Sequence, residues 1–531
     1  MNYPMRRTSL ILCLLLATTT VSWSAEQIGK TPEQLGKLSF ANSCDSAVQP
    51  TFERGVALLH SFWWQEGRKA FQQVLDKDPT CAIATWGIAA IDLGNPFATG
   101  PTPAQAKDAQ EAIARGRSIG AKTEREKLYI EAIAAYYDGY PARPHVVRMK
   151  ALANAFEALA ARYPDDDETQ IYYAIYLVGT QDPTDKTFAR TLKAAGILEA
   201  EYAKHPDHPG ISHYLIHSYD YPPIAEKGLP AARRYSDIAP SAPHALHMPS
   251  HIFTRVGAWQ ESIAANERAV AVSKSEHVVD EQLHSMDYMV YADLQLARDA
   301  DARRVIDAIA QVGTPTAAVA APFAIAAMPA RYALERSAWG EAAQLAPSDS
   351  QIAYVRAMPV FAHALGAARS GDAAAAEKDV QALGQLVDAL KAAKNQYWVT
   401  EVDVQRLSAA AWTDFAKGNR DSALTLMRSA ADLEDTSEMS AVTPGRLVPA
   451  RELLGDMLLE SGDPVDALKE YEASLLRDPW RFRSLFGAGQ AAVKAGNRDK
   501  ARYFYGQLVE MTGAGGTRPE LGTARAYLAS N

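Results

Sequence analysis

Histidine is the residue whose type and spacing carry the clearest chemistry in this sequence. Nine of the twelve histidines lie between positions 205 and 284. Two pairs have the i, i+4 spacing that places both side chains on one face of a helix, and they lie 34 residues apart: His213/His217 and His247/His251. Neutral imidazole is a common metal ligand, and two imidazoles at this spacing can share one ion. The pattern therefore predicts a transition-metal site.

The predicted ligand set draws on three successive stretches of the chain: His213, His217, His244, His247, His251, His284 and Asp287. Asp287 is either a further ligand or a carboxylate that orients an imidazole. Many imidazoles with few carboxylates favour Cu, Zn, Fe or Ni over Mg or Ca. The Cys-x-x-Cys-His motif that attaches haem is absent from the sequence.

A metal-free interpretation stands beside this one, in which the histidines form an aromatic, hydrogen-bonding wall of a binding groove. Four histidines fall outside the favoured positions, and we interpret them as structural: His205, His208, His277 and His363. Pro249 lies between His247 and His251 and should kink their helix, because proline removes a backbone donor. The kink either creates the site or spoils the shared-ion geometry.

Helices arranged in repeats are the elements that must position these side chains. Near the C-terminus four residues recur after 34 positions: Gly455/Gly489, Gly462/Gly496, Ala467/Ala501 and Tyr471/Tyr505. This is the period of the tetratricopeptide (TPR) helix–turn–helix repeat. Small residues suit the close helix crossing, and glycine suits the turn. We therefore predict an all-α, TPR-type helix–turn–helix superhelical solenoid.

The repeats resemble those of TPR proteins, and this resemblance implies that the first helix of each repeat lines the concave side of the solenoid. The six predicted histidine ligands fall at groove-facing positions of three neighbouring helices. The same rule predicts further groove-lining residues: His60, Tyr291, Arg331, Glu335, Trp412, Glu452 and Asp456. Arg331 is able to grip a carboxylate of a ligand. The alternative is a salt-bridged, solvated lining.

Length and charge limit the remaining choices. The chain has 531 residues, of which 48% are hydrophobic and 22% are charged, which is ordinary globular composition. A single core rarely grows past about 250–300 residues, so several domains or a repeat array are required. The net charge of −9 and the lack of a basic run argue against nucleic acid as a partner.

The N-terminus has the pattern of a secretory signal. Arg6 and Arg7 precede the apolar stretch 10–17, and Ser22 and Ser24 supply small residues for cleavage. That stretch is too short for a bilayer core of about 30 Å. We expect an exported protein, periplasmic or secreted, with no integral membrane segment after signal cleavage. Two cysteines remain, at positions 44 and 81, which allows one disulfide in an oxidising compartment without requiring it.

These observations divide the chain into five predicted parts. They are a signal peptide (1–24), an N-terminal extension (25–50), an N-terminal TPR-like array with the histidine-rich groove (51–315), a C-terminal TPR-like array (316–515) and a C-terminal tail (516–531).

Several longer phrases resemble a group of exported bacterial TPR proteins. They are RGVALLHSF (54–62), ALHMPSHIF (245–253), LHSMDY (283–288), LEDTSE (433–438) and TPGRLVPARELLG (443–455). The resemblance spans nearly the whole chain after the signal. It implies the repeat fold and one continuous unit, and it supplies no reaction.

Two functions fit the sequence. The first is a metalloprotein whose ion activates water or dioxygen, which includes a metal-dependent enzyme. The second is a metal-free scaffold that binds a peptide, a protein tail or a small polar ligand in the groove. The sequence assigns no catalytic residue, because Gly-x-Ser-x-Gly, phosphate-loop and dinucleotide motifs are all missing.

Overall fold

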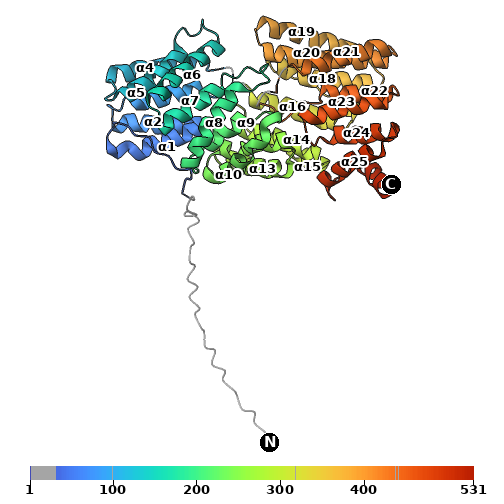
Figure 1. Cartoon of the computed structure of the whole chain (residues 1–531), viewed down its shortest axis with the longest axis horizontal. Coiled ribbons are helices and arrows are strands. Elements are labelled where there is room, and N and C mark those ends of the chain that lie inside the picture. The colour runs from blue at the N-terminus through green and yellow to red at the C-terminus, as the bar shows by residue number, and fades with distance from the viewer. Residues whose placement is uncertain (2–31, 99, 317–318, 437, 440–441, 531) are drawn as a thin grey trace. The chain divides into compact units, whose positions relative to one another are not determined.

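Helices that pack against their neighbours in sequence build this protein (Figure 1). The computed structural model describes residues 1, 32–98, 100–316, 319–436, 438–439 and 442–530. The predicted signal peptide therefore lies, apart from residue 1, outside the described residues. In the described part the regular elements are all helices, and none of these helices is long and apolar enough to cross a membrane. Residues 34–531 form one compact unit.

The helices in the first third of the chain form consecutive hairpins: α1 (Gln49–His60), α2 (Trp64–Lys77), α3 (Ile83–Leu93), α4 (Pro103–Ile119), α5 (Glu124–Tyr137), α6 (His145–Arg162), α7 (Asp167–Val178) and α8 (Ala189–Lys204). The histidine-rich helices follow: α9 (Pro209–Tyr219), α10 (Leu229–Ile238), α11 (Pro243–His247), α12 (Pro249–Val256), α13 (Trp259–Ser275), α14 (Val279–Gln295) and α15 (Asp299–Ala308).

The C-terminal helices complete the array: α16 (Ala320–Glu335), α17 (Trp339–Ala342), α18 (Ala353–Arg369), α19 (Ala373–Ala392), α20 (Gln396–Ala416), α21 (Arg420–Glu434), α22 (Ala450–Glu460), α23 (Pro464–Arg477), α24 (Phe482–Lys494), α25 (Arg498–Thr512) and α26 (Pro519–Ser530). Three short 3-10 helices connect longer ones: η1 (Ser46–Val48), η2 (Pro222–Gly228) and η3 (Ile309–Gln311).

The repeat chemistry predicted from the sequence is visible in the hairpin α22–α23. A Cβ added to Gly455 would lie 2.9 Å from the ring of Tyr471, so only glycine permits this helix crossing. Ala467 is fully buried at the crossing, and Gly462 turns the chain with a φ of +87°. The hairpin α24–α25 repeats the same features with Gly489, Tyr505, Ala501 and Gly496. The protein is therefore an all-α array of TPR-type helical hairpins, as the sequence predicts.

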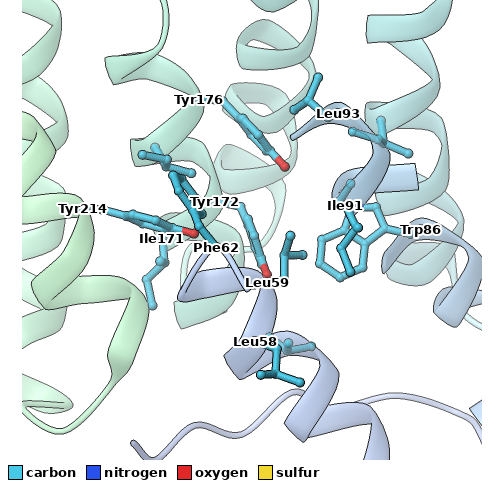
Figure 2. Packing of buried hydrophobic residues seen from close by; sticks show 14 of the residues in the cluster. Leu58, Leu59, Phe62, Trp86, Ile91, Leu93, Ile171, Tyr172, Tyr176 and Tyr214 are labelled. Carbon is cyan, nitrogen blue, oxygen red and sulfur yellow. The ribbon is translucent and has the colours of Figure 1, made fainter. Parts of the chain in front are cut away.

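An aromatic core joins the first helices to the histidine-rich ones. Trp86 on α3 packs against Tyr172 on α7, with 5.1 Å between ring centroids, and Figure 2 shows Leu59 of α1 beside them. Tyr214 on α9 lies against Phe62, which follows α1. Burying each large side chain contributes roughly 1.5–3 kcal/mol. This packing brings the end of α1 to α9, and His60 there lies beside Tyr214 although 154 positions separate them in the sequence.

Both chain ends of the compact unit are tied to its helices. A disulfide joins Cys44 to Cys81, the pairing that the sequence allows. The predicted C-terminal tail includes α26, and Arg518 before that helix binds Asp299 at the start of α15 (Nη2–Oδ1 2.7 Å). The two predicted arrays, 51–315 and 316–515, are parts of one compact unit.

Candidate metal centre

The six predicted histidine ligands lie together in the structure, in two groups of three. The first triad is His213 and His217 on α9 with His244 on α11. The second triad is His247 at the end of α11, His251 on α12 and His284 on α14. Within each triad, one potential ligand nitrogen from each residue lies within 4.8 Å of the other two. The geometry is that expected of side chains able to hold a metal ion.

One residue, Met248, separates two helices at the position where the sequence predicts a kink, and its φ and ψ (−52°, −36°) stay in the right-handed helical region. Helix α11 ends at His247 and α12 begins at Pro249, and the His251 N–H donates to the Met248 carbonyl in a tight turn (3.1 Å). The interruption does not separate the two rings. Nε2 of His247 lies 3.0 Å from Nε2 of His251. Both histidines therefore present the same nitrogen to a common point.

The second triad has its outer nitrogens occupied. Nδ1 of His247 lies 2.7 Å from Oδ1 of Asn266, whose Nδ2 donates to the Ser262 carbonyl, so the Asn266 oxygen must accept. Nδ1 of His251 lies 2.9 Å from a carboxylate oxygen of Asp220. Both Nδ1 atoms are therefore donors, and in the neutral rings both Nε2 atoms carry lone pairs. The lone pairs face each other without a proton between them.

The first triad repeats this arrangement in part. Nδ1 of His213 donates to the backbone carbonyl of His60 (2.6 Å), which leaves its Nε2 unprotonated and 3.1 Å from Nε2 of His217. Nδ1 of His244 lies 3.1 Å from Oε2 of Glu281. Nε2 of His244 is buried and has no hydrogen-bond partner among the described residues. Outer acceptors that fix the tautomer are typical of metal-binding histidines.

His284 supplies the third ring of the second triad. Its ring centroid lies 4.5 Å from that of His247. Its Nδ1 is buried and, within the described part of the chain, has no hydrogen-bond partner. A buried nitrogen without a partner costs free energy unless something outside the protein satisfies it.

Burial also sets the charge of these rings. Desolvation lowers the pKa of five of the six below the ordinary histidine value: His213, His217, His247, His251 and His284. Neighbouring imidazoles lower these pKa values further, since two adjacent rings do not readily both carry a charge. The rings are therefore neutral, which is the form that binds a metal.

Aromatic rings form one wall of the first triad. The ring of Phe62 lies 4.5 Å from that of His213 and stacks on that of His244 at 5.3 Å. Phe97 approaches His217 at 4.2 Å. His244 is half-buried, whereas all three rings of the second triad are buried. The first triad is thus the one nearer to solvent.

Asp287 does not join either triad. It is fully buried, and its Oδ1 accepts from Nε of Arg331 at 3.2 Å. The structure thus places Asp287 in an ion pair one helical turn from His284, instead of among the imidazoles.

The residues predicted to line a groove are also turned inward. Tyr291, Arg331, Glu335, Trp412, Glu452 and His60 are buried, and Asp456 is partly buried. Arg331 donates to the carbonyls of Gly445 and Arg446 (3.0 Å each), which belong to the segment before α22. At Arg331 the chain's own segment before α22 thus occupies the space that the sequence assigned to a ligand. A partner would have to displace that segment to reach Arg331.

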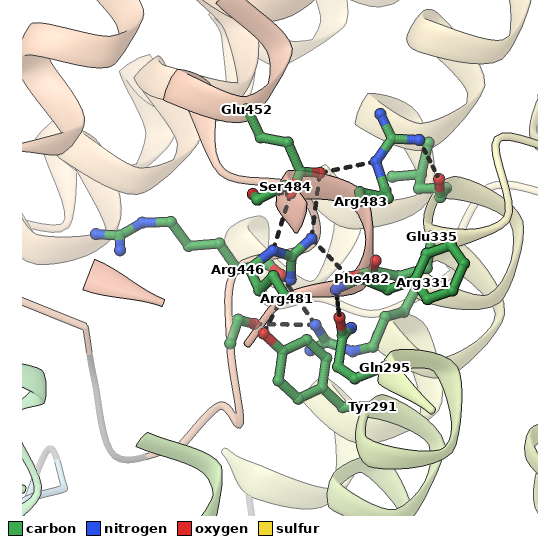
Figure 3. A network of polar contacts seen from close by, with 12 residues as sticks. Tyr291, Gln295, Arg331, Glu335, Arg446, Glu452, Arg481, Phe482, Arg483 and Ser484 are labelled. Atoms are coloured by element: carbon green, nitrogen blue, oxygen red, sulfur yellow. Dashed lines mark hydrogen bonds and ion pairs between the residues drawn. The ribbon is translucent and has the colours of Figure 1, made fainter. Parts of the chain in front are cut away.

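Figure 3 shows the network that fills this space. Arg481 lies between Glu335 (2.9 Å) and Glu452 (3.1 Å) and donates to the hydroxyl of Tyr291 (2.9 Å). Burial opposes ionisation of Glu452, but Arg481 and Arg483 outweigh it and lower the pKa of Glu452 to about 2. We call Arg331, Arg481 and Arg483, together with Asp287, Glu335, Glu452 and Tyr291, the arginine–carboxylate network.

A third histidine group is complete without an ion. His60 and His208 each place Nε2 at 2.9 Å from a different oxygen of Glu168. Nδ1 of His208 accepts from the Gly210 N–H, and Nδ1 of His60 lies 2.9 Å from the hydroxyl of Tyr214. Every ring nitrogen has a partner, so this group is structural. It also holds the His60 carbonyl against His213.

Three outer partners were missed in the sequence: Asp220, Glu281 and Asn266. Asp220 lies three residues after His217, and Glu281 lies three before His284. The i, i+3 spacing from predicted ligands is a signal that could have found these two. Asn266 lies on α13, the second helix of its hairpin, and no local pattern connects it with His247.

Comparisons with known proteins add little to this description. No family model matches the chain, and no curated protein matches it. Among solved structures, the chain is similar to the TPR domain of P58(IPK), at 12% sequence identity and a TM-score of 0.21, over 91% of this chain and 99% of that domain. The fold class above rests on the helical hairpins themselves.

Proposed function

We propose that this chain is a transition-metal-binding protein whose centre is formed by the first and second triads. One observation carries the proposal. Nε2 of His247 and Nε2 of His251 lie 3.0 Å apart, while each Nδ1 is committed to an acceptor on Asn266 or Asp220. Two lone pairs at this distance repel each other, and burial disfavours the proton that would relieve the repulsion. A cation between them turns the repulsion into two bonds.

The donor set favours a particular class of ion. Imidazole nitrogens fill both triads, a set that suits Zn, Cu, Ni or Fe better than Mg or Ca. An ion about 2.0–2.1 Å from two nitrogens that are 3.0–3.1 Å apart makes an N–metal–N angle of about 90–100°. Such an angle suits two ligands in adjacent positions of one ion. Three protein ligands leave a position for water or substrate, which is the arrangement of a catalytic site.

An exported location is part of the proposal. The disulfide between Cys44 and Cys81 supports it, because disulfides persist in oxidising compartments. The signal-like N-terminal pattern in the sequence agrees with this location.

A metal-free scaffold for a peptide or protein tail is the competing function. It relied on Arg331 and Trp412 as contacts, and both side chains are buried within the chain's own packing. We therefore assign no partner to them. Partner capture that survives removal of metal would favour this alternative.

Elemental analysis of the mature chain, purified without an affinity tag, tests the proposal. We expect bound transition metal, or stoichiometric uptake when the protein is reconstituted with Zn(II) or Cu(II). The variant His247→Gln/His251→Gln should lose metal from the second triad. A control variant, His277→Gln/His363→Gln, changes two histidines that belong to no group of potential metal ligands among the described residues, and it should keep the full amount. Wild-type protein that contains no metal and takes up none would overturn the proposal.

A further inference from the structure

We infer that the centre holds two metal ions, one in each triad, that act as a pair and share a bridging hydroxide. This inference rests on the proposed metal-binding function and adds the number of ions and the small ligand between them.

The ligand nitrogens converge on two points instead of one. Each triad contains its own pair of Nε2 atoms, close enough for both to bind the same ion. The Nε2–Nε2 distance is 3.1 Å between His213 and His217, and 3.0 Å between His247 and His251. Each pair comes from a single stretch of chain with i, i+4 spacing and can hold an ion by itself. Six imidazoles around one ion would instead require all the nitrogens to face a common centre.

The two points are nevertheless adjacent. His244 and His247 lie on the same helix, α11, with ring centroids 6.1 Å apart, although they belong to different triads. His217 and His251 also meet across the boundary, at 6.2 Å between centroids. The triads therefore share a wall. Two-metal sites with ions about 3.5–4 Å apart hold a small oxygen ligand between them.

Charge balance points to an anion as that ligand. Two divalent ions bring four positive charges into a buried site whose six ligands are neutral. Asp220 is already paired with Arg255 (Oδ1–Nε 2.8 Å), and Asp287 with Arg331. Glu281 remains to offset the ions, and its Oε1 is buried without a hydrogen-bond partner in the described part of the chain. A hydroxide, formed when bound water loses a proton to solvent, supplies further negative charge between the ions.

The test counts ions and asks whether they interact. The full mature chain is loaded with Cu(II), and copper per chain is measured for wild type, His217→Gln, His284→Gln and the double variant. We expect two copper ions per chain in wild type, one in each single variant and none in the double variant. Electron paramagnetic resonance should give the single variants the spectrum of an isolated Cu(II), integrating to one ion per chain. The wild-type signal should be strongly attenuated, because bridged ions couple magnetically.

The outcomes separate the two proposals. One ion per wild-type chain would overturn the pair and leave the metal-binding function standing, whereas no ion would overturn both. Two ions retained by each single variant would show that the triads are not the ligands. A wild-type signal at the full intensity of two isolated ions would overturn the bridge. If a variant fails to fold by circular dichroism, the wild-type stoichiometry and spectrum decide alone.

Discussion

The histidine triads and the arginine–carboxylate network are both built from buried or partly buried polar side chains, yet they are chemically opposite. Helix α14 contributes to both, with His284 in the second triad and Asp287 in the network. In the network each buried guanidinium meets a carboxylate, such as Arg481 between Glu335 and Glu452. In the second triad, two nitrogen lone pairs face each other at 3.0 Å, and in the first triad the Nε2 atoms of His213 and His217 lie 3.1 Å apart.

In the network, the buried charges are balanced within the chain. In the triads, nitrogen ligands converge with no positively charged side chain of the described residues between them. The network takes both signs of charge from the chain itself, although Oδ2 of Asp287 and Oε2 of Glu335 are buried without a hydrogen-bond partner among the described residues. In the triads, the outer nitrogens of four rings lie against Asn266, Asp220, the His60 carbonyl and Glu281, and the two inner Nε2 atoms of the second triad lack a donor. Buried polar groups without partners are costly, and such groups point to a ligand when they converge. Buried atoms without partners occur in both regions among the described residues, so what marks the site is the convergence of three imidazole nitrogens to within 4.8 Å of one another in each triad.

The largest effect should follow from breaking the network. Glu452→Gln keeps the shape of the side chain but leaves Arg481 and Arg483 with less negative charge nearby. Removing one partner of a buried ion pair typically costs about 3–5 kcal/mol, and we expect a loss of that size in urea unfolding. The control Glu131→Gln breaks an exposed pair with Arg117 and should cost less than about 1 kcal/mol. Equal losses in the two variants would contradict the assigned role of the network.

Removing metal should destabilise the protein through the triads alone. A ligand at about 1,000 times its Kd stabilises the folded state by about 4 kcal/mol, so a chelator should lower the melting temperature markedly. The Glu452→Gln variant should show the same chelator-dependent shift as wild type, because the network does not bind the ion. The His247→Gln/His251→Gln variant should show a smaller shift. A chelator that leaves the wild-type melting curve unchanged would speak against a bound ion.

The local sequence pattern predicted the helical repeat and the proximity of the six histidine side chains. Both depend on spacing along one helix or from one repeat to the next. The 34-residue period placed His213 and His247 at equivalent positions, and the structure brings them into adjacent triads. The network could not be predicted in this way. Arg331 meets Gly445 and Tyr291 meets Arg481 over more than 100 residues, and helical periodicity contains no information about such contacts. The contact of Arg331 with the segment before α22 could not be predicted for the same reason.

Asp293 is a buried carboxyl that belongs to neither region. It shows what burial does to the pKa of an acidic group outside the triads and the network. Burial, together with Asp301 nearby, raises the pKa of its carboxyl to about 7, against an unfolded value of about 3.9. The proton is thus held more tightly in the folded state, and the associated stability is lost as the pH rises through about 7. From pH 5 to pH 8, wild type should lose about 2–3 kcal/mol relative to Asp293→Asn in urea unfolding. Parallel pH profiles of the two proteins would contradict this assignment.

Loss of an outer partner should weaken metal binding while leaving all six imidazoles in place. Asp220→Asn replaces the carboxylate that accepts from Nδ1 of His251, and such changes typically cost about 10–100-fold in metal affinity. Competition with a chromophoric chelator, performed on folded protein at low temperature, measures this loss separately from stability. The matched control is Asp379→Asn, since Asp379 accepts from Nδ1 of His363 at 2.6 Å outside the triads. If both variants bind metal as tightly as wild type, Asp220 has only a structural role. The contacts of the outer nitrogens would then not distinguish the triads from the arginine–carboxylate network.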